Sequence, residues 1–124
     1  FTEALLVRES DVLLLAIAQQ YYKNLQYDIA KQYLFRVNYE SEDDDLVLKS
    51  KLLLADIYFA ENNYAEAKNE YESILLKDDS IADAYFGLGN VYEKLGDIAK
   101  ARSEWRKTLK VQINHSGAIS KLGL

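Results

Sequence analysis

Two stretches of the chain repeat each other at a spacing of 34 residues. The matched residues keep their size and polarity class from one stretch to the next. They are Leu54-Ala55, Tyr58, Asn62, Tyr64, Ala67 and Tyr71 in the first stretch, and Leu88-Gly89, Tyr92, Gly96, Ile98, Ala101 and Trp105 in the second. A fixed period of this length is typical of stacked helical repeats, in which each unit buries its apolar face only against its neighbours.

Each stretch contains two helical stripes separated by a turn. In the earlier stretch the second stripe recurs at i, i+4, i+7 and i+8, and its members are Ala67, Tyr71, Ile74 and Leu75. The turns are predicted at Asn62-Asn63 and at Gly96-Asp97, because asparagine and glycine accept a positive φ. The chain has no proline and only 5 glycines, which favours long uninterrupted helices.

A weaker third copy precedes these two, and partial copies flank all three. Ala30 lies 37 residues before Ala67, so three extra residues fall in the acidic segment 39–45, which we expect to be a solvated loop. We therefore expect repeats over residues 11–47, 48–81 and 82–115. Residues 1–10 are expected to be the tail of a preceding repeat helix, and residues 116–124 the truncated first helix of a further repeat or a cap.

At these positions the chain resembles the tetratricopeptide repeat family. Six elements of the family pattern occur in order, and the residues that carry them are Tyr85, Leu88-Gly89, Tyr92, Gly96, Ala101 and Trp105. Lys51 departs from the large residue at the first position, and no copy has the closing proline. The resemblance implies an all-α fold: about seven helices in antiparallel pairs that form a right-handed superhelix.

Small residues recur where the paired helices should come closest. They are Ala18, Ala55 and Gly89 in the first helices and Ala30, Ala67 and Ala101 in the second. Small side chains at these places let two antiparallel helices approach, and aromatic residues fill the space between one pair and the next.

The family binds extended peptides in a concave groove, which the first helix of each repeat lines. The implied partner-binding groove residues are Leu15, Gln19, Tyr22, Lys49, Leu52, Asp56, Phe59, Asp83, Phe86, Asn90 and Glu93. Leu52, Phe59 and Phe86 would form an exposed apolar row, which suggests a docking surface. The alternative is that they contact second helices or a neighbouring repeat.

The groove's charge predicts the chemistry of its partner. Its acidic residues favour a protein or peptide with apolar and some basic side chains. Some family members clamp a peptide C-terminus with basic and amide groups on these helices, but only Gln19 is compatible with that role here. We therefore expect no such clamp.

Other classes of site find little support in the sequence. The net charge of −5 argues against nucleic acid and anionic membranes, and no apolar run reaches the about 18 residues of a membrane-spanning helix. His115 has no partner at a useful spacing, and the run from Glu40 to Asp45 lacks the order of a calcium loop. Gly87-Leu88-Gly89 lacks the third glycine of a dinucleotide site. We expect no catalytic residue, metal or cofactor.

Three functions remain open at this point. The first is a non-catalytic protein–protein interaction module. The second is a substrate- or partner-recruiting region of a larger enzyme, since a chain that starts at Phe1 reads as a piece of a longer protein. The third is self-assembly into a homo-oligomer through an exposed apolar end around Ile119 and Leu122. The absence of cysteine leaves the compartment open, with the cytoplasm favoured.

Overall fold

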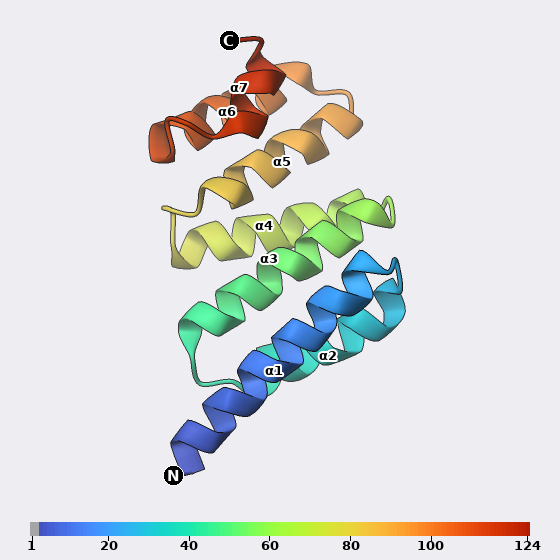
Figure 1. The fold of residues 1–124 in the computed structure, drawn as a ribbon. Coiled ribbons are helices and arrows are strands. Elements are labelled where there is room, and N and C mark those ends of the chain that lie inside the picture. The colour runs from blue at the N-terminus through green and yellow to red at the C-terminus, as the bar shows by residue number, and fades with distance from the viewer. Residues whose placement is uncertain (1–2) are drawn as a thin grey trace. The chain divides into compact units, whose positions relative to one another are not determined.

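The described part of the protein consists of α-helices alone. The computed structural model describes the backbone of residues 3–124 and the side chains of residues 10–39 and 41–124. Its helices are α1 (Glu3–Lys23), α2 (Tyr27–Glu40), α3 (Asp44–Ala60), α4 (Tyr64–Lys77), α5 (Ala82–Lys94), α6 (Ile98–Val111) and α7 (Ser116–Leu122), as Figure 1 shows. The expected all-α fold of paired helices is confirmed. The right-handed course of a superhelix stays a prediction.

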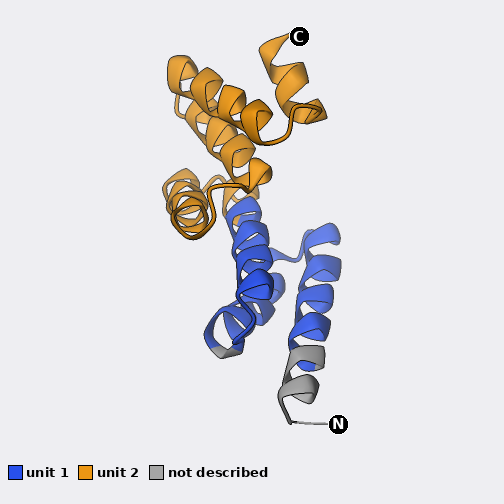
Figure 2. Cartoon of the chain, turned by 90° about the vertical axis from the view of Figure 1, so that its left-hand side faces the viewer, with its two compact units in different colours: residues 1–57 blue, residues 58–124 orange. Residues whose placement is uncertain are grey.

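The chain divides into two compact units, residues 1–57 and 58–124 (Figure 2). In the first unit α1 packs against α2, and in the second α5 packs against α4 and α6, while α6 also packs against α7. The boundary lies inside α3. The compact units therefore do not coincide with the predicted repeats, whose limits stay predictions.

The turn inside each helix pair has the same geometry at equivalent positions. Leu25, Asn62 and Gly96 have φ values of 62°, 64° and 86°. The amide that follows each of them donates to a tyrosine carbonyl five residues earlier. These bonds join Gln26 to Tyr21 at 2.9 Å, Asn63 to Tyr58 at 2.8 Å, and Asp97 to Tyr92 at 2.9 Å. The predicted turns are thus confirmed, and each ends its helix in a left-handed cap.

The first helix differs from the sequence prediction at its start. Residues 1–10 were expected to belong to a separate preceding helix, but α1 runs without interruption from Glu3 to Lys23. The reason is local, because this stretch contains neither proline nor glycine to end a helix. The polar group Glu9-Ser10-Asp11 lies within the helix and marks no boundary.

The predicted small residues lie in the interior of the pairs. Ala18, Ala30, Ala55, Ala67 and Ala101 are all fully buried. Gly89 shows how close the approach is, since a Cβ atom added there would lie 2.4 Å from Nε1 of Trp105. Trp105 is itself buried, at 2% exposure, so its ring has little room to move. Glycine is required at this position because α5 and α6 meet there.

This close approach predicts a coupled pair of substitutions. Gly89→Ala should destabilise the protein by about 1–2 kcal/mol, because overpacking against Trp105 outweighs the gain in helix propensity. In the double variant with Trp105→Tyr the loss should be smaller than the sum of the two single losses by about 1 kcal/mol, because the smaller ring leaves room for the methyl group. Urea unfolding of the four proteins measures this coupling.

Gly96→Ala is the matched control for this cycle. It adds the same methyl group at a turn with φ of 86° and nothing within 4 Å. Its cost should therefore add to that of Trp105→Tyr without coupling. A Gly89→Ala loss that adds to Trp105→Tyr in the same way would contradict the packing explanation.

Candidate functional site

In the first unit, the residues predicted to bind a partner lie on α1 and α3. Gln19 and Lys49 are exposed, whereas Tyr22, Leu52 and Asp56 are half-buried. These five residues are called the α1–α3 surface below.

The inclusion of Leu15 in the partner-binding set is wrong. Leu15 is only 6% exposed and belongs to the core of the first unit. It lies about 60° around the helix axis from fully buried Ala18, so the stripe that faces the core is wide enough to include it.

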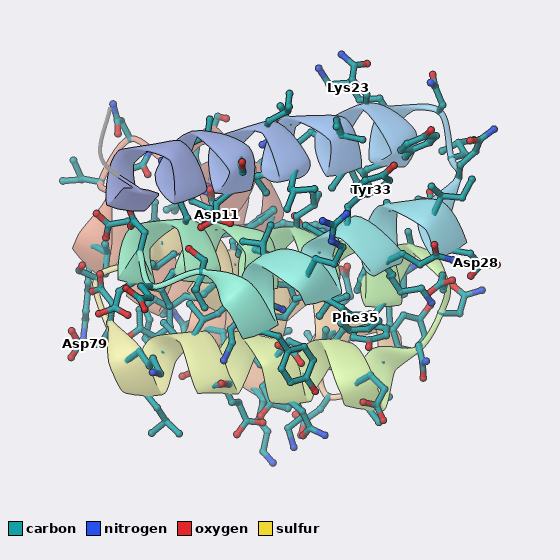
Figure 3. All side chains as sticks on the ribbon, turned by 90° about the horizontal axis from the view of Figure 1, so that it is seen from below. Asp11, Lys23, Asp28, Tyr33, Phe35 and Asp79 are labelled. Atoms are coloured by element: carbon teal, nitrogen blue, oxygen red, sulfur yellow. The ribbon has the colours of Figure 1, made fainter. Side chains whose placement is uncertain are left out.

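Tyr22 and Asp56 bring an aromatic ring and a carboxylate together from two helices. Burial raises the pKa of the Tyr22 phenol, and the negative charge of Asp56 and the neighbouring Tyr27 raise it further. The rings of Tyr22 and Tyr27 lie 5.8 Å apart. In the adjacent α1–α2 contact, Tyr33 points from α2 toward α1, where its ring stacks on that of Tyr21 at 5.8 Å (Figure 3). Aromatic side chains therefore line this end of the hairpin.

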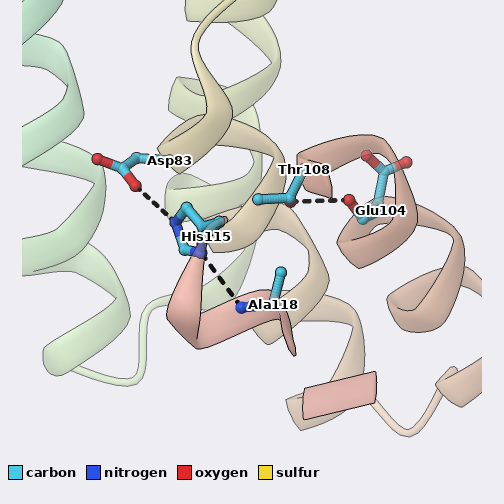
Figure 4. Close-up of polar contacts among 5 residues, drawn as sticks. All are labelled: Asp83, Glu104, Thr108, His115 and Ala118. Atoms are coloured by element: carbon cyan, nitrogen blue, oxygen red, sulfur yellow. Dashed lines mark hydrogen bonds and ion pairs between the residues drawn. The ribbon is translucent and has the colours of Figure 1, made fainter. Parts of the chain in front are cut away.

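In the second unit, the predicted residues of α5 are already in contact with other parts of the chain. Nε2 of His115 lies 2.9 Å from Oδ1 of Asp83 (Figure 4). The rings of Phe86 and His115 are 4.8 Å apart. Phe86 also packs against the cluster that contains Ala118 of α7, so it follows the alternative of contact with a neighbouring repeat.

The other predicted residues of the second unit also have partners within it. Trp105 Nε1 donates to Oδ1 of Asn90 at 3.3 Å, and Nζ of Lys121 lies 2.8 Å from Oε1 of Glu93. Phe59, at the end of α3, contacts Tyr64 with ring centroids 5.5 Å apart.

The segment that covers α5 is α7 with its N-cap. His115 Nδ1 accepts a hydrogen bond from the Ala118 amide at 3.1 Å, so Nε2 carries the proton that faces Asp83. Ala118 is fully buried, and Leu122 packs against the same cluster as Trp105. Lys121 lies over the Trp105 ring at 5.5 Å. Helices this short are marginal alone, so these contacts with α5 and α6 hold α7 in place.

His115 and Leu122 both differ from the sequence expectations. His115 does have a carboxylate partner, 32 residues away in the sequence, which local spacing could not reveal. Leu122 is half-buried against the cluster of the second unit, and Ile119 is half-buried as well, while self-assembly through this end stays a prediction. The 34-residue register, which predicts residues 116–124 as the first helix of a further repeat, is the signal for these contacts, because such a helix packs against the second helix before it, here α6.

Two general properties of the described residues bear on this site. No group of three or more His, Cys, Asp or Glu side chains among them could hold a metal ion. None of the helices in the part of the chain that the structure covers combines the length and apolar character needed to cross a membrane.

The capping role of His115 predicts a local effect. His115→Ala removes the cap of α7 and the contact to Asp83, which should raise amide exchange in α7 at least about fivefold, since an N-cap contributes about 1 kcal/mol. His115→Asn keeps a capping acceptor and should cause a smaller increase. Hydrogen exchange read residue by residue checks both, with the amides of α4 as the internal reference. Unchanged exchange in α7 of His115→Ala would contradict the role.

The raised pKa of Tyr22 predicts a pH dependence of stability. A phenol whose pKa is higher in the folded state than in the unfolded state stabilises the fold fully below the unfolded value of about 10. That contribution is lost as the pH rises from this value through the folded pKa. Tyr22→Phe should therefore flatten the alkaline loss of unfolding free energy, and Asp56→Asn should reduce it in part. Tyr39→Phe removes the hydroxyl of a side chain that is 88% exposed, so the alkaline loss of unfolding free energy that Tyr22 causes should remain.

Comparison with solved structures places the fold among tetratricopeptide repeat (TPR) domains. The first TPR of Spaghetti (RPAP3), bound to the HSP90 peptide SRMEEVD, has a TM-score of 0.80 at 19% identity, over 93% of this chain and 89% of that one. The Arabidopsis OM64 TPR domain has a TM-score of 0.82 at 16% identity, over 94% of each chain. YrrB, a TPR protein with an unusual peptide-binding site, has a TM-score of 0.80 at 22% identity.

The extent of these matches differs between relatives. The YrrB match covers 92% of this chain but only 57% of YrrB. No match was found among curated proteins. The family model described as the C-terminal ARM domain of tetratricopeptide repeat protein 21 matches residues 1–121. This match includes all three repeats that the sequence predicts, over residues 11–115. The chain therefore belongs to the tetratricopeptide repeat protein 21 C-terminal ARM domain family.

Proposed function

We propose that this chain is a protein-interaction repeat module that binds a segment of a partner protein on the α1–α3 surface. The segment carries apolar and basic side chains. Asp56 pairs with a basic group, while Tyr22 and Leu52 provide apolar contact area. Binding here involves no reaction, and the same surface would also serve to recruit a substrate or partner to a larger enzyme.

The observation that carries this proposal is the combination of Tyr22 and Asp56 on neighbouring helices. Both are half-buried, and they are close enough for the carboxylate to raise the pKa of the phenol. A carboxylate beside aromatic surface attracts a cation more strongly than a fully solvated carboxylate does. Exposed Gln19 and Lys49 add polar groups at the same face.

The second unit gives an internal example of a first helix that binds a basic segment. There α5 presents Asp83 and Glu93, whereas the positions 34 residues earlier on α3 hold Lys49 and Phe59, so the anion on α3 is Asp56 instead. The segment that covers α5 contributes the cation Lys121 to Glu93, the His115 ring to Asp83, and the apolar residues Ala118 and Leu122. A first helix of this chain thus accepts a short amphipathic helix with a basic side chain.

Relatives of the same fold are consistent with this proposal. The first TPR of Spaghetti is bound to a peptide of HSP90, and YrrB is a TPR protein with an unusual peptide-binding site. These are properties of those proteins. They support peptide binding as the class of function to test first in this chain.

Fluorescence anisotropy with labelled peptides tests the proposal. A peptide of about 12 residues that alternates Leu and Lys should bind, and Asp56→Asn should weaken its binding about threefold to tenfold, because one partly desolvated ion pair is lost. Tyr22→Ala should weaken it further by removing apolar contact area.

The control variant is Asp79→Asn, which removes the same charge from an exposed site outside the α1–α3 surface. It should leave the affinity for the Leu–Lys peptide within about twofold, the size of a screened long-range effect. Equal losses of affinity in Asp56→Asn and Asp79→Asn would show that the peptide binds through general electrostatic attraction and not through the α1–α3 surface. An unchanged affinity in Asp56→Asn would remove this surface from the proposal.

A further inference from the structure

The outer face of α6 is basic from Arg102 to Lys110. Its exposed charged residues are all cations, and they are Lys100, Arg102, Arg106, Lys107 and Lys110. The exposed apolar residues Ile98 and Val111 lie at the two ends of the helix. Small exposed residues, Ala99 and Ser103, lie between them. The helix holds five of the 15 lysines and arginines of the chain but only one of its 20 acidic residues. Positive charge is thus concentrated on one helix of an acidic protein.

Three of these cations form a single ridge. Arg102, Arg106 and Lys110 follow one another at i, i+4 and i+8, so they share one side of the helix over about 12 Å. Lys107 is paired with Glu104 at 3.1 Å, and Lys100 with Asp97 at 3.9 Å. None of the three ridge cations forms an ion pair with any described side chain. Their charges are open to a ligand.

The repeat fold does not require this ridge. In the preceding repeat, the positions equivalent to the ridge hold Lys68, Glu72 and Leu76. In the first repeat they hold Lys31, Phe35 and Tyr39. Because the other second helices have mixed side chains at the same places, helix packing alone does not explain three cations in a row on α6.

We propose that this ridge, Arg102, Arg106 and Lys110, binds an acidic segment of a partner protein. Each arginine presents a planar fork of donors that matches a carboxylate. The small side chains of Ala99 and Ser103 let the partner's backbone come close to α6. A ridge of about 12 Å matches three carboxylates on one face of a helix or on a short extended strand.

The rest of the chain argues for a short acidic segment over a long polyanion. Outside α6 the chain has 19 acidic residues and only 10 lysines and arginines. A nucleic acid strand or an anionic membrane extends well past a ridge of this length and would meet that negative surface. A peptide that ends with the ridge avoids it. This inference concerns another surface and the opposite ligand charge from the proposed function, so the two stand or fall separately.

The test uses the whole 124-residue chain and a labelled helical peptide of about 16 residues with glutamate at every fourth position. Arg102→Gln, Arg106→Gln and Lys110→Gln together should weaken its binding about tenfold or more, since three exposed ion pairs are lost. The matched control combines Lys23→Gln, Lys77→Gln and Lys94→Gln, three exposed cations on other helices. It should change the affinity less than about threefold.

Further arms separate the possible outcomes. A peptide of the same composition with its glutamates spread around the helix should bind about tenfold more weakly, because it matches one cation at a time. Arg102→Glu with Arg106→Glu should lose the glutamate peptide and gain a lysine counterpart, which guards against loss through unfolding. Amide resonance shifts caused by the glutamate peptide should cluster on α6.

Four results would overturn the inference. One is an equal loss of affinity for the glutamate peptide in the ridge and control variants. Another is equal binding of the peptide with glutamates on one face and the peptide with glutamates spread around the helix. The third is binding of single-stranded DNA or phosphatidylserine vesicles without binding of the glutamate peptide. The fourth is a molecular mass that rises with concentration in the wild type but not in the ridge variant, since the ridge would then be occupied by the acidic segment 42–45 of a second copy.

Discussion

The close approach of two helices within each pair is the contact on which the rest of the structure depends. It needs a small residue on the first helix. The side chain that faces it on the second helix can be larger only where the residue on the first helix is smaller. In the second unit Gly89 of α5 meets Trp105 of α6, since a Cβ atom at Gly89 would overlap the buried indole ring. In the first unit the equivalent positions of α1 and α2 hold Ala18 and Leu34, both fully buried. The small residue thus lacks its methyl group where the large one is a tryptophan, as expected for close-packed interiors.

The turns show how a repeat can keep its geometry while its residues change. Gly96 takes a positive φ without cost, and Asn62 at little cost, whereas Leu25 adopts the same conformation at a cost of about 1–2 kcal/mol. In all three turns the next amide donates a hydrogen bond to a tyrosine carbonyl. The local strain at Leu25 is therefore offset by the same cap and by the burial of the helix pair. Residue type predicts the turns at Asn62 and Gly96. Only the register of the repeat predicts the one at Leu25.

The same distinction explains which parts of the site could be predicted. Spacing fixes where a residue lies around its own helix, and this was enough for the paired helices, the turns and the buried alanines. It does not fix which neighbour covers that side. Leu15 is buried although it adjoins the exposed stripe of α1, and Asp83, Phe86 and Glu93 face α7 and its cap. The continuity of α1 through residue 10 was also missed, since polar residues suggest a boundary that the backbone does not need.

In a chain of repeats, function is best sought where equivalent positions differ. Packing positions recur with the same size because every pair must close in the same way. The positions that depart from this rule are the ridge of cations on α6, and the exposed or half-buried Gln19, Tyr22, Lys49, Leu52 and Asp56. The first is basic, while the second pairs a carboxylate with aromatic surface. A ridge of three cations and a separate surface with a carboxylate beside aromatic side chains would let one small module hold two partners of different charge, because each surface discriminates by charge against the other's ligand.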